Sequence, residues 1–287
     1  MYCLTQTQHL LEVNYQLMIS TTKQTKPSIF KKIIKIFLIA TFWILVWEAA
    51  SRLVSRNNDL MLLILPSPFT VFKKWTELAF TAPFIKAGLH TLARIFTGYI
   101  IGVVLGFLIG IFTHISNLAY SLLSPILKII RAVPVVAIII LMYLFFSSST
   151  LPIIIVCLMV LPLVWQTVHD GLTNTDKSLL EMSKVFNLSK TKTLLNVKLP
   201  VVVPNLISSC VNALGLAWKS GVAAEVICLP TMSLGTMLWH SKGSIDFDEV
   251  YAVTLTVVVL SIIIEILLKY LCSKYLTRNG GALNDRT

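Results

Sequence analysis

Charged residues are scarce in this chain, and acidic residues are the scarcest of them. The 287 residues include 24 lysines and arginines but 13 aspartates and glutamates, and charged residues make up 13% of the total. Soluble domains carry about one quarter charged residues. Because 56% of the residues are hydrophobic as well, the composition excludes an ordinary soluble protein and predicts one that crosses a membrane several times.

Clusters of metal-ligating or nucleophilic side chains are also missing from the sequence. The cysteines form no CxxC pair and the histidines no pair at ligand spacing, so we expect neither a disulfide nor a metal site. No glycine-rich loop of the form GxxxxGK[ST] occurs, so the chain is not expected to hydrolyse ATP itself. These gaps argue against an enzyme. The residues concerned are Cys3, Cys157, Cys210, Cys228, Cys272, His9, His90, His114, His169 and His240.

Long apolar runs, in contrast, are abundant. Each is close to the roughly 20 residues that a helix needs to cross a bilayer, and none alternates every two residues as a barrel strand does. The sequence therefore predicts an all-α polytopic membrane protein with six transmembrane helices. The expected spans cover residues 33–50, 92–112, 126–146, 151–168, 201–227 and 250–271.

The net charge of +11 indicates topology rather than a nucleic-acid partner, because cytoplasmic loops of membrane proteins collect lysine and arginine. Lysines precede the first span and follow the last, so both termini are expected in the cytoplasm. The loop 241–249 carries three acidic residues and is expected outside. Five basic residues fit this topology poorly because they fall on the outer side: Arg52, Arg56, Lys73, Lys74 and Lys86.

The chain divides into one membrane domain and two tails. Residues 1–28 are polar and without pattern, and we expect a disordered cytoplasmic tail there, with Met18 as an alternative start. Residues 29–275 form the transmembrane domain, which contains a cytoplasmic loop at 169–200. Residues 276–287 form a cytoplasmic tail.

Four glycines recur at four-residue spacing in the second span: Gly98, Gly102, Gly106 and Gly110. This spacing puts them nearly on one helix face, where another helix can approach to backbone distance. The pattern predicts tight helix packing. It leaves open whether the neighbouring helix belongs to the same chain or to a second subunit.

Two further segments combine polar and apolar residues. Residues 65–78 place apolar side chains on one helical face and predict a short amphipathic helix in the membrane interface. In the fifth span, Lys219 and Glu225 interrupt an apolar stretch, at a cost of roughly 2.5–3.5 kcal/mol each in a bilayer core. Six residues apart, they point to different sides, towards a cavity or a partner; snorkelling of Glu225 to an interface remains an alternative.

The loop before residue 200 contains its own helical pattern. Asp176 or Ser178 can cap a helix over residues 179–186, and Asn187 can end it in a left-handed conformation. Ser189 can cap a second helix over 190–197, which Leu199-Pro200 would end. The apolar side chains Leu179, Leu180, Met182 and Phe186 suit a groove on a soluble partner; the alternative is a membrane-surface hairpin without a partner.

This loop resembles the signature of ABC-importer permeases, which reads E-A-A, three residues, Gly, nine residues, I-x-L-P. The spacing is intact, with two substituted alanines and an asparagine in place of glycine. Segments at 65–68, 90–106, 130–134 and 217–225 resemble the nitrate/sulfonate/taurine branch, so the resemblance covers roughly residues 33–275. The matching positions are Glu181, Met182, Ser183, Asn187, Val197, Leu199 and Pro200.

The resemblance implies the type I ABC importer permease (MetI-like) fold and a transport role. Two permeases, expected as a homodimer, would form the path, and cytoplasmic ATPases would bind the loop and the ATP; this chain would hold no cofactor. An external binding protein would select a small solute such as nitrate, a sulfonate or taurine, bicarbonate or a thiamine-pyrimidine precursor. The translocation path is expected at Arg131, Pro134, Trp218, Lys219 and Glu225.

A single-component transporter driven by an ion gradient is the alternative function. It would require charge relays near the membrane midplane and internal repeats. Apart from Lys219 and Glu225, the sequence contains neither.

Overall fold

The computed structural model describes residues 29–55 and 64–284, and every regular element in these two ranges is a helix. The all-α class is confirmed. The chain separates into two compact units, residues 1–59 and 60–287. The tail expected over residues 1–28 and the basic residue Arg56 lie outside the described residues.

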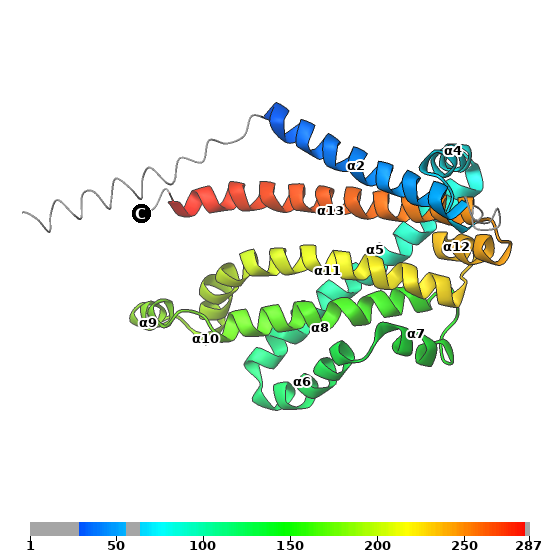
Figure 1. Cartoon of the computed structure of the whole chain (residues 1–287). Coiled ribbons are helices and arrows are strands. Elements are labelled where there is room, and N and C mark those ends of the chain that lie inside the picture. Colours follow the sequence, from blue (N-terminus) through cyan, green and yellow to red (C-terminus); the bar gives the residue numbers. More distant parts are fainter. Residues whose placement is uncertain (1–28, 56–63, 285–287) are drawn as a thin grey trace, which may run out of the picture. The chain divides into compact units, whose positions relative to one another are not determined.

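The first unit contains helix α2 (Ile29–Ser55), drawn in blue in Figure 1. Its segment Phe37–Val54 is apolar enough to cross a membrane, and most of its large apolar side chains are exposed. Near the end of α2, Arg52 Nε lies 2.6 Å from Glu48 Oε1. A basic residue that fitted the expected topology poorly therefore has an acidic partner one helical turn away.

The second unit is built around the pair of long helices α5 (Ala82–Ile115) and α8 (Leu151–Thr173). The short helix α4 (Pro68–Ala79) precedes α5. The other elements, in chain order, are α6 (Asn117–Ala132), α7 (Val135–Tyr143), α9 (Lys177–Val185), α10 (Lys190–Thr193), the π-helical turn η1 (Leu194–Lys198), α11 (Leu199–Cys228), α12 (Leu234–Gly243) and α13 (Phe247–Asn284).

Within residues 29–55 and 64–284, five helices are long and apolar enough to span a membrane, and α6 with α7 makes a sixth if this bent pair counts as one span. Five expected spans lie inside α2, α5, α8, α11 and α13. The sixth expected span, over 126–146, is sharply bent at Pro134, where a kink was expected, because α6 and α7 meet at 104°. Val133, which precedes Pro134, is extended with ψ 134°, as residues before proline commonly are.

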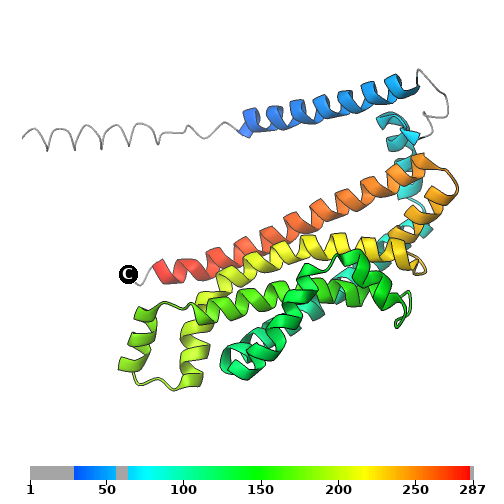
Figure 2. The same cartoon turned by 60° about the horizontal axis from the view of Figure 1, so that its bottom comes forward.

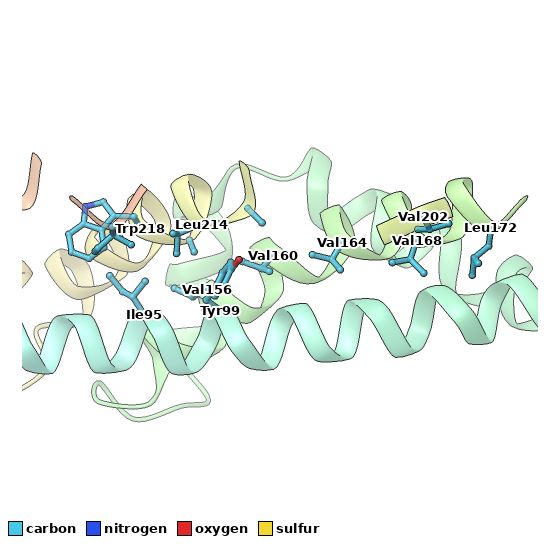
Figure 3. Packing of buried hydrophobic residues seen from close by; sticks show 13 residues of the cluster. Ile95, Tyr99, Val156, Val160, Val164, Val168, Leu172, Val202, Leu214 and Trp218 are labelled. Carbon is cyan, nitrogen blue, oxygen red and sulfur yellow. The ribbon is translucent and has the colours of Figure 1, made fainter. Parts of the chain in front are cut away.

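The glycine face of α5 packs against α8 of the same chain. A Cβ added at Gly98, Gly102, Gly106 or Gly110 would lie within 3 Å of a valine Cβ on α8. These valines also recur every four residues and are completely buried (Figure 3): Val156, Val160, Val164 and Val168. The predicted tight packing is confirmed. For this face of α5, the neighbouring helix belongs to the same chain and not to a second subunit.

The short helix α4 packs against the first turns of α13. Ser67 caps α4 by accepting a hydrogen bond from the backbone N–H of Thr70. Val71 is buried, and Trp75 Nε1 donates to Thr256 Oγ1 at 2.9 Å. The predicted helix is confirmed, whereas its position in a membrane interface stays a prediction.

The second unit has two distinct ends. In Figures 1 and 2, α9 and α10 lie at one end of the long helices, and α4 and α12 lie at the other. At the latter end, Lys74 Nζ lies 2.8 Å from Asp246 Oδ2. The loop with acidic residues thus supplies a partner for a second of the basic residues that fitted the expected topology poorly.

Candidate functional site

Helix α9 projects from the end of α8 between two local stop signals. Asp176 Oδ1 accepts a hydrogen bond from the backbone N–H of Ser178 at 3.0 Å, which satisfies a free amide at the helix start. Asn187 has φ 53°, and its N–H donates to the carbonyl oxygen of Lys184 at 2.9 Å. Both signals are as predicted, and the helix begins two residues earlier than expected.

One side of α9 faces the protein and the other is exposed. Ser183 is 4% exposed and its hydroxyl donates to the carbonyl oxygen of Leu180; Leu179 and Leu180 are half-buried. Met182 and Phe186 are 46% and 70% exposed. The outer surface of α9 therefore combines apolar side chains with the exposed carboxylate of Glu181.

The second half of the loop differs from the prediction. Ser189 caps α10, as expected, but the helix does not end at Leu199-Pro200. The helix passes through η1 into α11. Val197 lies in η1, before the start of α11, and Pro200 lies in the first turn of α11. Proline has no N–H to donate to the preceding turn, and the π-helical turn accommodates it, since the Leu199 N–H donates to the Leu194 carbonyl five residues back.

An aromatic cluster connects α5, α6 and α8 near this end. The rings of Tyr120 and His169 stack with their centroids 4.4 Å apart. Trp165 Nε1 donates to Thr113 Oγ1 at 3.0 Å, and that oxygen lies 3.1 Å from His169 Nδ1. Sequence reasoning missed this cluster, since its members come from three helices and share no spacing.

The break between α6 and α7 borders a cavity of about 300 Å³. Arg131 lies at its edge and is bonded to the side-chain oxygen of Gln166 on α8. Pro134 occupies the cap position of α7 and is exposed. Leu216 of α11 also lines the cavity, and the exposed Lys219 lies on the same side of α11, three residues further along.

Glu225 lies at the other end of the second unit and is completely buried. Its carboxylate accepts hydrogen bonds from Thr91 Oγ1 at 2.8 Å, from Arg94 Nη1 at 3.3 Å and from the backbone N–H of Gly235 at 3.4 Å. Arg94 also donates to the carbonyl oxygens of Thr231 and Met232. The interpretation that Glu225 snorkels to an interface is therefore wrong.

The residues expected along the translocation path do not meet at one point in a single chain. Arg131 and Pro134 are at the α6–α7 break, while Lys219 is exposed and Glu225 is buried, on different sides of α11 as expected. Trp218 is 4% exposed and its Nε1 donates to the Val257 carbonyl of α13 at 3.1 Å. Within this chain, Trp218 packs α11 on α13 rather than lining a cavity.

Comparison with known proteins agrees with this architecture. The family described as binding-protein-dependent transport system inner membrane component matches residues 102–276. The nitrate import permease protein NrtB of Leptolyngbya laminosa is 26% identical over 187 residues, 64% of this chain and 66% of its own length. The taurine transport system permease protein TauC of Escherichia coli K12 is 26% identical over 241 residues, 82% and 84% of the two chains.

A solved structure has the same fold. The methionine ABC transporter MetNI, in an inward-facing conformation, superposes with a TM-score of 0.58 at 19% identity, over 68% of this chain and 95% of the other. The expected importer-permease fold is confirmed.

Proposed function

Because this chain belongs to the family of binding-protein-dependent transport system inner membrane components, we propose that it forms the solute path of an ABC importer in a cytoplasmic membrane. Cytoplasmic ATPase subunits bind the ATP, and an extracytoplasmic binding protein delivers the solute. The family match over residues 102–276 supports this function over an ion-gradient transporter, and neither catalysis nor a cofactor is assigned to the chain.

The contact with the ATPase is proposed at the exposed face of α9. Met182 and Phe186 offer apolar side chains to a groove, and Glu181 offers a carboxylate to a basic residue. Such apolar anchors dominate the affinity of helix-in-groove contacts. Asn187 and Ser189 hold α9 in place, since they terminate one helix and start the next.

Co-purification tests this contact. The tagged chain would be expressed with the ATPase of its transport system, and Phe186→Glu or Glu181→Ala should lower the recovered ATPase by about tenfold or more if they are interface anchors. Lys192→Ala, an exposed change on α10, is the control. Failure of the wild-type chain to bind any ATPase would refute the proposed function.

The proposed solute is a small polar molecule or ion, such as nitrate, a sulfonate or taurine, bicarbonate or a thiamine-pyrimidine precursor. The names of NrtB and TauC support the first two. So does the position of Arg131 at the α6–α7 cavity, because a guanidinium attracts oxyanions. In this proposal, Arg131 contacts the solute as it passes through the membrane.

Uptake into vesicles with the binding protein and ATPase tests this role. Arg131→Gln should lower the initial rate by about tenfold, the effect of one lost charged hydrogen bond, and Arg131→Lys should retain most of it. Equal activity of all three proteins would remove Arg131 from the path.

A second copy of the chain is proposed to complete the path as a homodimer. Arg131 and Lys219 are both exposed on the single chain, although each lies within a segment apolar enough to span the bilayer. Charged side chains facing lipid are costly, and a facing copy would enclose them in a shared aqueous cavity.

A further inference from the structure

Outside this path, a pocket of about 480 Å³ lies behind α9. It lies between α9, the last residues of α5 and the run of α10 and η1, so three separate segments form its walls. Its volume is within the range that binds small molecules or headgroups, about 300–1,000 Å³.

The polar part of this pocket is cationic. Lys184, Lys190 and Lys198 line it together with His114, and no carboxylate is among its lining residues. Among the ion pairs found in residues 29–55 and 64–284, none involves these three lysines. The three lysines therefore have no acidic partner among the described residues, and their charge is available to an anionic ligand.

Lys198 is held in position by a hydrogen-bonded chain. Its Nζ lies 2.9 Å from His114 Nε2, and His114 Nδ1 lies 3.2 Å from Thr173 Oγ1. The ammonium donates to the ring, which in turn donates to the threonine hydroxyl. Two N–H groups of Lys198 remain for another acceptor, and its half-buried position strengthens a contact with an anion.

The wall also has an apolar part, formed by Ile115, Leu180, Leu188 and Leu194, beside the hydroxyls of Ser183, Thr191 and Thr193. The pocket opens at the end of α5, a helix long and apolar enough to cross a membrane, so it lies where a bilayer surface is expected. Basic pockets in this position recognise phosphate-bearing headgroups, and the apolar wall suits the glycerol and upper chain of a lipid.

We propose that this pocket binds a phosphate group at the membrane surface, carried by an anionic phospholipid headgroup or free as inorganic phosphate. The lysine side chains donate to its oxygens, and Leu180 and Leu194 contact the apolar part of a lipid. Because α9 forms one wall and η1, which leads into α11, forms another, the ligand links the proposed ATPase contact to the membrane helices. This consequence for coupling rests on the proposed function, whereas binding does not.

Two matched variants and one added charge test the site. Lys184→Gln/Lys198→Gln removes two pocket cations, and Lys177→Gln/Lys192→Gln removes two exposed lysines of the same loop that do not line the pocket. Thr191→Glu places a carboxylate at the exposed pocket rim. Thermal unfolding of each full-length variant in detergent establishes that it is folded.

Binding is measured in two arms. Native mass spectrometry of the purified chain in mixed phosphatidylglycerol and phosphatidylcholine counts retained anionic lipid, and titration calorimetry in phosphatidylcholine nanodiscs measures inorganic phosphate. We expect the pocket variant and Thr191→Glu to weaken binding by about tenfold or more in one arm, the scale of charge-assisted hydrogen bonds, with the control pair unchanged.

The arm that responds identifies the source of the phosphate group. The proposal is overturned if neither ligand binds the wild-type chain, or if the control pair loses as much as the pocket variant, because general surface charge then accounts for the binding. If the wild-type chain binds lipid or phosphate but no ATPase, the proposed function fails and the pocket assignment stands.

Discussion

At the scale of single residues, the carboxylate of Glu225 is completely buried and accepts three hydrogen bonds. Arg94 is 12% exposed at its side chain and Glu225 not at all, so neither can be solvated by water if the pair is broken. The sequence predicts that Glu225 needs a partner, because it interrupts an apolar helix. It does not predict Arg94, which lies on another helix and becomes a neighbour through the packing of α5 and α11.

Removing the cation of this pair should destabilise the fold strongly. For Arg94→Met we expect a loss of about 3–5 kcal/mol in the free energy of unfolding, since a buried charge loses its partner. Lys269→Met, which breaks the exposed Lys269–Glu265 pair on α13, should have little effect. An SDS unfolding titration measures the free energy of unfolding of both variants. Similar losses for the two would contradict the larger contribution expected of the buried pair.

The Lys74–Asp246 pair should make stability depend on pH. The hydrogen bond to Asp246 raises the pKa of Lys74 despite partial burial. Burial alone would raise the pKa of Asp246, but hydrogen bonds from Lys74 and from the Glu249 backbone outweigh it, and the pKa is lowered. The pair therefore stabilises the fold fully between pH values of about 3.9 and 10.4, which are the ordinary pKa values of aspartate and lysine.

The sign follows from which form each group prefers. As pH falls through the lowered pKa of Asp246, the contribution of Asp246 to the free energy of unfolding is lost. As pH rises through the raised pKa of Lys74, the contribution of Lys74 is lost. Both side chains are partly exposed, so we expect only about 0.2–1 kcal/mol. The unfolding midpoint of Lys74→Met against pH should lack the alkaline limb and show a smaller acid limb, because the Glu249 N–H still donates to Asp246; identical profiles for variant and wild type would contradict this.

At the scale of elements, the α5–α8 contact permits a comparison within one helix. A Cβ at Gly98 would lie 2.4 Å from the Ile153 carbonyl oxygen, whereas at Gly88 nothing lies within 4 Å. Gly98→Ala should destabilise by about 1–3 kcal/mol through overpacking. Gly88→Ala should be neutral or stabilising by up to about 1 kcal/mol. Unfolding titrations that give equal signs for the two would refute the close approach.

Two prolines show where sequence reasoning reaches its limit for elements. Pro134 separates two helices at an angle of 104° where a kink was expected, and Pro200 lies inside a helix that was expected to end. Both outcomes obey the same chemistry, because proline lacks an N–H and restricts its predecessor. The difference depends on the π-helical turn before Pro200 and on packing around the cavity, which no local spacing reports.

The spans, the glycine face and both caps of α9 could be predicted because each depends on neighbours within a few residues. The pocket behind α9 could not, since His114 and Lys198 are brought together by the folding of α5 against η1. The same holds for the pairing of Trp218 with α13.

At the scale of the whole molecule, the arrangement of charge predicts orientation. The lysine-bearing loop with α9 and the loop with Asp246 lie at opposite ends of the second unit. On a background without native cysteines, an impermeant maleimide added to intact cells should label Ser244→Cys, and Ser178→Cys only after the membrane is opened; both serines are exposed. The reverse pattern would invert the proposed topology.

The matched rows of glycine and valine also set the mechanics of the molecule. The four-residue repeat means that the next equivalent register lies about 6 Å away along the axis, and every intermediate register would set the valines against the larger side chains between the glycines. Sliding of α5 along α8 is therefore blocked, and the two helices form one strut. We therefore expect α5 and α8 to move together as one unit during transport, with the break between α6 and α7 as a place where the chain bends.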